Sequence, residues 1–94
     1  MLAVHPGEML KEELEAREMS ANKLALALRL PSSRIVSIIN GKRGISPETA
    51  LRLARYFGNS AQFWLNMQTA YELAVAEREI GEQIAAEVIP AEAA

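Results

Sequence analysis

Side chains able to form hydrogen bonds recur at helical spacing in the middle of the chain. Ser33, Ser37 and Asn40 fall on one side of a helical wheel drawn at about 100° per residue. Val36 falls on the same side and adds methyl groups to it. Hydroxyl and amide groups can pair with the edges of bases, and a small methyl-bearing side chain can pack on a thymine methyl. These residues therefore have the chemistry to read duplex DNA.

An apolar stripe on the other side of the wheel should turn these side chains outward. It consists of Ile35, Ile38 and Ile39. Gly41 follows at the position where a left-handed residue commonly ends a helix, and Lys42 and Arg43 come directly after it. We therefore expect a short helix over residues 33–40 with two cations beyond its end.

A preceding helix is expected to support this one. It begins at Ser20, whose hydroxyl is a favourable N-cap. Its buried residues recur at helical spacing and are Leu24, Ala25 and Leu28. Arg29 follows where a left-handed bend would favour glycine, and Pro31 can open the next helix. The pair predicts a helix-turn-helix that presents residues 33–40 to the major groove, although an ordinary helical hairpin has similar spacing.

Charge is segregated along the chain, although the net charge is only −2. Residues 20–58 carry seven cations and one carboxylate, whereas residues 1–19 have a net charge of −3 and residues 59–94 a net charge of −5. A basic centre between acidic ends is the arrangement expected if the centre meets phosphate. This distribution favours the DNA-reading interpretation over the plain hairpin. For Arg52 and Arg55, one turn apart, contact with the DNA backbone and solvation are both open, and solvation is preferred.

Two further helices are expected on either side of this pair. One runs from about Pro6 to Arg17, and its buried stripe is Met9, Leu10 and Leu14. The other begins at Pro47 after the N-cap Ser46 and ends at Gly58. Its predicted apolar side consists of Ala50, Leu51, Leu53, Ala54 and Phe57.

A last helix is expected from about Ser60, and its apolar residues continue farther than one small core can cover. Exposed apolar stripes on small proteins often mark interfaces. We therefore expect a homodimer interface at Tyr71, Val75, Ile80 and Ile84. Gly81 can weaken or bend this helix, Pro90 should end it, and residues 85–94 are expected to fray. The prediction is an all-α fold, with a DNA-binding domain over residues 1–76 and a helical extension and tail over residues 77–94.

Composition argues against several other classes of protein. The chain has no cysteine and a single histidine, His5, so neither a disulfide nor a metal site is expected, and His5 is assigned a capping or surface role. No nucleophile and base are paired by spacing, so we expect no enzyme and no cofactor. No apolar run reaches the roughly 18 residues that span a membrane, and no signal peptide is evident, so a cytoplasmic location is expected.

Three segments carry a family resemblance: HPGEML, then SANKLALAL with PSSRIVSIINGKRGIS, then ETALRLARYFGNSAQFWLNMQTAYEL. Together they resemble the HigA-type (VapI-like) antitoxins of the Cro/repressor-like (XRE) helix-turn-helix family. The resemblance covers roughly residues 5–75. Arg29 departs from it, because the family usually has glycine at that position. The resemblance implies a five-helix Cro/repressor-like domain with an extended C-terminal helix.

The resemblance also implies a function with two parts. Such an antitoxin neutralises a HigB-like toxin, a small ribosome-dependent mRNA endonuclease, and as a dimer represses its own operon by binding palindromic operator DNA. The family's DNA-contact positions map onto Ser32, Ser33, Arg34, Ser37 and Asn40. Contacts to phosphate are expected from Asn22, Lys23, Lys42 and Arg43, with Arg34 as a further candidate. Two alternatives stay open, a free-standing transcriptional regulator and a protein-interaction module without a DNA role.

Overall fold

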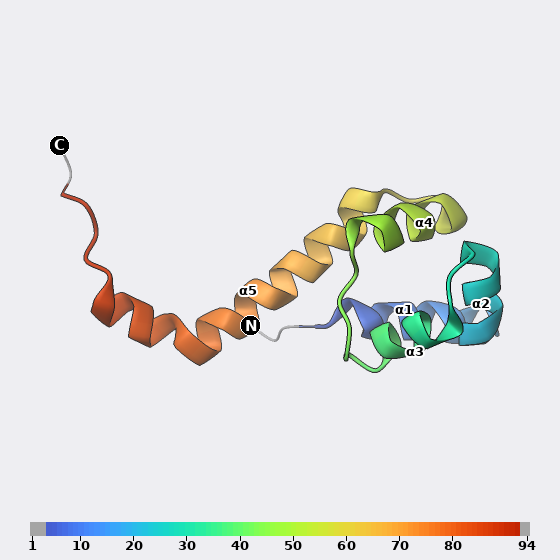
Figure 1. The fold of residues 1–94 in the computed structure, drawn as a ribbon, viewed down its shortest axis with the longest axis horizontal. Helices are drawn as coiled ribbons and strands as arrows, with labels where there is room; N and C mark the ends of the chain where they lie inside the picture. The colour runs from blue at the N-terminus through green and yellow to red at the C-terminus, as the bar shows by residue number, and fades with distance from the viewer. Residues whose placement is uncertain (1–3, 93–94) are drawn as a thin grey trace.

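The structure is a computed structural model, and it describes residues 4–92. Within that range the chain forms helices and no strand: α1 (Pro6–Ala16), α2 (Ala21–Leu28), α3 (Ser32–Ile39), α4 (Pro47–Phe57) and α5 (Ala61–Glu87). The first four helices and the start of α5 form a compact body, from which the rest of α5 projects (Figure 1). The all-α fold with a long last helix is therefore confirmed.

The helices α1, α2, α4 and α5 begin where the sequence supplies capping side chains, whereas α3 follows Pro31 without a side-chain cap. Ser20 Oγ accepts a hydrogen bond from the Lys23 amide at 3.0 Å, and Ser60 Oγ accepts one from Phe63 at 3.0 Å. His5 is the N-cap of α1, where its Nδ1 accepts from the Gly7 amide at 2.9 Å. The capping role predicted for the single histidine is confirmed.

Left-handed residues end the first two helices without the help of glycine. Arg29 follows α2 with φ 60°, and the amide of Leu30 donates to the Ala25 carbonyl at 2.9 Å. Glu18 has φ 51° after α1, which the sequence pattern did not indicate. A left-handed L-residue costs about 1 kcal/mol, and the terminal hydrogen bonds offset that cost. Arg29 thus takes the conformation that its place in the turn required.

One hydrophobic core joins the five helices. Its buried residues are Leu10, Leu14, Leu24, Ala25, Leu28, Ile35, Ile38, Ile45, Ala50, Leu53, Ala54 and Trp64. The prediction for Leu51 is wrong, because its side chain is 64% exposed. At about 100° per residue, Leu51 is rotated well away from the direction shared by Ala50, Leu53 and Ala54. Burial follows that shared direction rather than hydrophobicity alone.

α5 extends beyond the hydrophobic core. Trp64 and Gln68 are its only fully buried residues in the described chain, and its outer half is largely exposed. The helix continues to Glu87 and residues 88–92 are outside any helix, so the fraying expected over residues 85–94 stays a prediction, and the last two residues of that range, 93 and 94, lie outside the described residues. α5 also crosses the predicted boundary between residues 76 and 77 without interruption, so that division stays a prediction. No helix in residues 4–92 has the length and apolar content needed to cross a membrane.

Candidate nucleic-acid interface

The hydrogen-bonding side of α3 faces outward. Ile35 and Ile38 are completely buried, while Ser33 and Asn40 are exposed and Ser37 is half-buried. Val36 is 44% exposed on the same side. No side chain of the described residues makes a hydrogen bond to Ser33, Ser37 or Asn40, so their polar groups are available to a ligand. The geometry that base reading requires is present, and the individual base contacts stay predictions.

α1 supports the back of this helix at very close range. A Cβ at Gly7 would collide with the carbonyl of Ile38, so only glycine lets the start of α1 approach the end of α3 this closely. The His5 cap fixes the start of α1 at the same place. The outward direction of α3 is therefore set by contacts on its inner side.

The basic loop after α3 is tied at both ends. The amides of Lys42 and Arg43 donate to the Ser37 carbonyl at 2.9 and 3.2 Å, with Gly41 in the left-handed conformation at φ 73°. The Gly41 amide also donates to the Ile38 carbonyl at 3.0 Å, and with the bond from Lys42 this is the hydrogen-bond pattern of a glycine-ended helix, as predicted. Both Lys42 and Arg43 are exposed, and neither forms an ion pair within residues 4–92. Their positions suit contacts to phosphate.

Gln68 of α5 holds the other end of this loop, and the sequence analysis missed it. Its Oε1 accepts from the buried amide of Ile45 at 2.8 Å, and its Nε2 donates to Glu72 at 2.7 Å. Gly44 lies so close that a Cβ there would be 2.7 Å from Gln68 Nε2. One feature of the sequence could have identified Gln68: it follows Trp64 by one turn and therefore lies on the same, core-facing side of α5.

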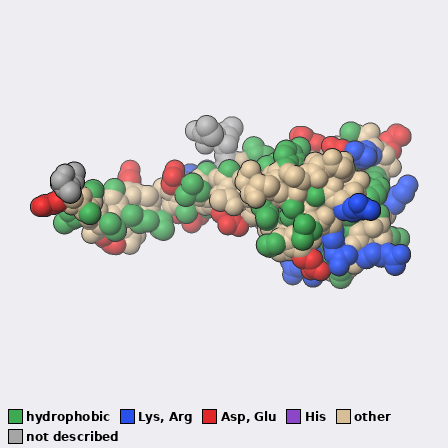
Figure 2. Space-filling view, turned by 90° about the horizontal axis from the view of Figure 1, so that it is seen from above, with side chains coloured by type: hydrophobic (Ala, Val, Ile, Leu, Met, Phe, Trp, Pro, Cys, Tyr) green, Lys and Arg blue, Asp and Glu red, His purple; other side chains and the backbone are tan. Residues whose placement is uncertain are grey.

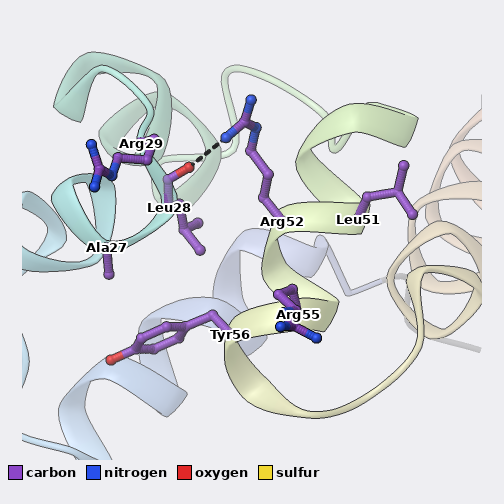
Figure 3. A pocket seen from close by; sticks show the side chains of 7 residues that line it. All are labelled: Ala27, Leu28, Arg29, Leu51, Arg52, Arg55 and Tyr56. Carbon is purple, nitrogen blue, oxygen red and sulfur yellow. Dashed lines mark hydrogen bonds between the residues drawn. The ribbon is translucent and has the colours of Figure 1, made fainter.

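Arg34 and Arg52 are less free than the sequence suggested. Arg34 Nη1 lies 3.6 Å from Glu48 Oε1, and Arg52 Nη2 lies 3.2 Å from Glu48 Oε2. Arg52 Nη1 also donates to the Leu28 carbonyl at 2.9 Å (Figure 3). The preference for a simply solvated Arg52 is wrong, because this arginine caps the end of α2, whereas its contact with the DNA backbone stays a prediction. Arg55 is exposed on the rim of a groove lined by the end of α2 and by α4, and it makes no ion pair among the described residues.

Apart from Arg78 on α5, the Lys and Arg residues not yet described lie on the compact body. Lys and Arg side chains dominate parts of its surface in Figure 2, whereas the narrow part formed by α5 shows mainly acidic and apolar side chains. Asn22 and Lys23 are exposed in the first turn of α2, where phosphate contacts were predicted. Ser32 is exposed at the start of α3. The acidic C-terminal segment is thus separated in space from the basic centre, whereas the acidic helix α1 packs beside α3.

The four residues predicted for a dimer interface lie on two sides of α5. The Tyr71 ring packs edge-on against His5 of the same chain, with centroids 4.8 Å apart, and Val75 follows on that side, half-buried. Ile80 and Ile84 are nine residues further on from these two, about half a turn around the helix. They are 44% and 47% exposed. A partner lying along one side of α5 would therefore meet Ile80 and Ile84 without Tyr71.

Known proteins share this fold and much of this sequence. The helix-turn-helix family model matches residues 10–64. Virulence-associated protein I of Dichelobacter nodosus is 56% identical over 80 residues, covering 84% of this chain and 74% of the relative. The structure of a HigA-family addiction module antidote protein from Coxiella burnetii has a TM-score of 0.93 and 48% identity, and the match covers 97% of this chain and all of that one (100%).

A third match is the structure of the Pseudomonas aeruginosa antitoxin HigA with the higBA promoter. It has a TM-score of 0.94 and 42% identity, and the match covers 97% of this chain and 100% of the other. The residues that match the family model include the α2–α3 pair whose outward face is described above. The chain therefore belongs to the helix-turn-helix family and, within it, to the HigA-type antitoxins.

Proposed function

We propose that this protein is the antitoxin of a type II toxin–antitoxin pair and represses its own operon. The observation that carries the DNA-binding part is the exposed face of α3, where Ser33, Val36, Ser37 and Asn40 lie free of the core beside the cations Lys42 and Arg43. The structural relative from Pseudomonas aeruginosa is an antitoxin solved with promoter DNA, which supports the same role here. The protein acts in the cytoplasm, where both its operon and the toxin's mRNA substrate are found.

In this proposal α3 enters the major groove. Ser33, Ser37 and Asn40 contact base edges, and Val36 packs on a thymine methyl. Lys23, Lys42 and Arg43 contact phosphate and supply most of the affinity, which therefore falls steeply with salt. A two-fold dimer sets two α3 helices about 34 Å apart, one turn of DNA, so that a palindromic operator fits both.

The toxin-binding part rests on family membership. The partner is a HigB-like mRNA endonuclease encoded beside this gene, and its contact surface on this chain is open. Co-expression of the two proteins should allow copurification and should restore growth to cells that produce the toxin.

Binding to DNA is tested with a duplex taken from the region upstream of the gene. In a gel-shift titration, the protein should bind this duplex more tightly than a scrambled duplex of equal length. If the protein prefers this duplex to the scrambled one but no toxin copurifies with it, the result would support a free-standing regulator instead. Absence of binding to any duplex at low salt would refute the DNA-binding role and leave a protein-interaction module.

A further inference from the structure

Glu48 is the one carboxylate in the basic stretch from residue 20 to residue 58, and it lies between two guanidinium groups. Glu48 is the second residue of α4, Arg34 belongs to α3, and Arg52 follows Glu48 by one turn. Through its bond to the Leu28 carbonyl, Arg52 extends this cluster to the end of α2 (Figure 3). Glu48 thus connects α3 to α4, and its partner Arg52 connects α4 to α2.

The ion pair restrains Arg34 in particular. Its side chain is only 29% exposed, and its Nε is buried without a hydrogen-bond partner in the described chain. Arg34 also lies on the flank of α3, next to the face that carries Ser33 and Ser37. An arginine at this position would reach phosphate or bases if it were free, because its side chain is long and always charged. The ion pair with Glu48 therefore holds the Arg34 charge beside the start of α4.

We propose that Glu48 is a positioning residue that sets how strongly this protein prefers its operator to other DNA, an inference that rests on the proposed DNA-binding function. A restrained Arg34 enters the operator complex with little conformational freedom to lose. A released Arg34 would be a mobile cation able to find a phosphate on any duplex, and such contacts carry no sequence information. Releasing it should therefore help unrelated DNA more than it helps the operator.

If Glu48 served only to stabilise the fold, its removal would change the binding of both duplexes by the same factor. Its side chain is 62% exposed, and exposed ion pairs contribute little to folding stability. Glutamine keeps the size of the side chain and its hydrogen-bonding oxygen while removing the charge. Glu48→Gln should therefore fold like the wild type, so that changes in DNA binding can be read separately from unfolding.

The experiment compares the full chain with Glu48→Gln, Arg34→Gln and the double variant. Fluorescence anisotropy measures binding to the upstream duplex and to a scrambled duplex at several salt concentrations, and thermal melting checks the fold. Glu12→Gln is the charge-matched control. This exposed residue of α1 lines a hollow beside Asn40 and Gly41 at the end of α3, and it forms no ion pair within residues 4–92.

Glu48→Gln should bind the scrambled duplex roughly threefold more tightly at low salt, with a salt slope steeper by about 0.9, the value for one added phosphate contact. The ratio of operator to scrambled affinity should fall, and Arg34→Gln should abolish this effect in the double variant. The inference is overturned if Glu48→Gln changes both duplexes by the same factor, as Glu12→Gln should, or if the effect persists without Arg34. A wild type that binds no duplex would overturn the proposed function as well.

Discussion

The hydrogen bond between Gln68 and the loop after α3 gives a sharp test of how α5 supports DNA binding. Gln68 is 7% exposed, and its Oε1 accepts from the amide of Ile45, which is 4% exposed. In Gln68→Leu a side chain of similar volume replaces the acceptor. The Ile45 amide then stays buried without a partner.

An unsatisfied buried amide costs about 1 to 3 kcal/mol. The leucine recovers part of this through apolar burial, so we expect a net loss of about 1 to 2 kcal/mol in the free energy of unfolding. The lost bond to Glu72 adds only a few tenths of a kcal/mol, since it joins neighbouring turns of one helix near the surface. Urea denaturation measures the total.

The same variant should weaken operator binding under conditions where it is still folded. Freeing the loop means that Lys42 and Arg43 must be ordered on binding, at about 0.5 to 1.5 kcal/mol for each immobilised side chain. For the two side chains together this is about 1 to 3 kcal/mol, so the operator affinity should fall roughly 5- to 150-fold in a titration at a temperature well below the melting transition.

Gln62→Leu is the matched control. It changes the same residue type on the same helix, but Gln62 is exposed and its side chain bonds only to Asn66 within residues 4–92, at 2.7 Å. Its stability and DNA affinity should stay close to those of the wild type. Equal effects of the two variants on stability and on binding would refute the reasoning, because burial of the Ile45 amide would then have no energetic consequence.

Three other variants test separate parts of the proposed interface. Lys42→Ala should weaken binding to operator and unrelated duplexes alike and reduce the steepness of the salt dependence by about 0.9. The control Arg78→Ala on α5 should change neither the affinity nor the slope. An unchanged slope for Lys42→Ala would rule out its phosphate contact. Asn40→Ala should cost about 1 to 3 kcal/mol at one base position, measured by competition with singly substituted operators, while uniform loss would indicate a backbone contact. Ile84→Glu should convert a dimer to a monomer in analytical ultracentrifugation, while Ala85→Glu adds the same charge on another side of α5. A dimer that survives Ile84→Glu would exclude Ile84 from the interface.

Local patterns in the sequence were sufficient to predict most of the helix-turn-helix. Capping needs only a side-chain oxygen a few residues before an amide, so Ser20 and Ser46 could be identified as N-caps without a fold, and the last helix was placed from about Ser60. The inward isoleucines of α3 followed from periodicity alone. A left-handed bend was expected at Arg29 although glycine would suit it better, and only the structure shows that Arg29 adopts it, with φ 60°.

Contacts between helices distant in sequence were not predictable in the same way. Gln68 and Ile45 are 23 residues apart, and Arg52 and Leu28 are 24 residues apart. Nothing in the spacing of either pair distinguishes a bonded side chain from a solvated one. Leu51 shows the converse, because its hydrophobicity suggested burial and its direction on α4 left it exposed.

The sequence by itself determined which side of α3 carries hydrogen-bonding groups and where each helix begins, because both depend on residues within a turn or two of each other. Only the tertiary structure decided which of the cations are free. Arg34 and Arg52 share Glu48, while Lys42 and Arg43 extend into solvent from a loop that Gln68 holds in place. The physical reason is that an ion pair or a buried hydrogen bond depends on distances across the core, which the packing of α4 and α5 against the other helices sets.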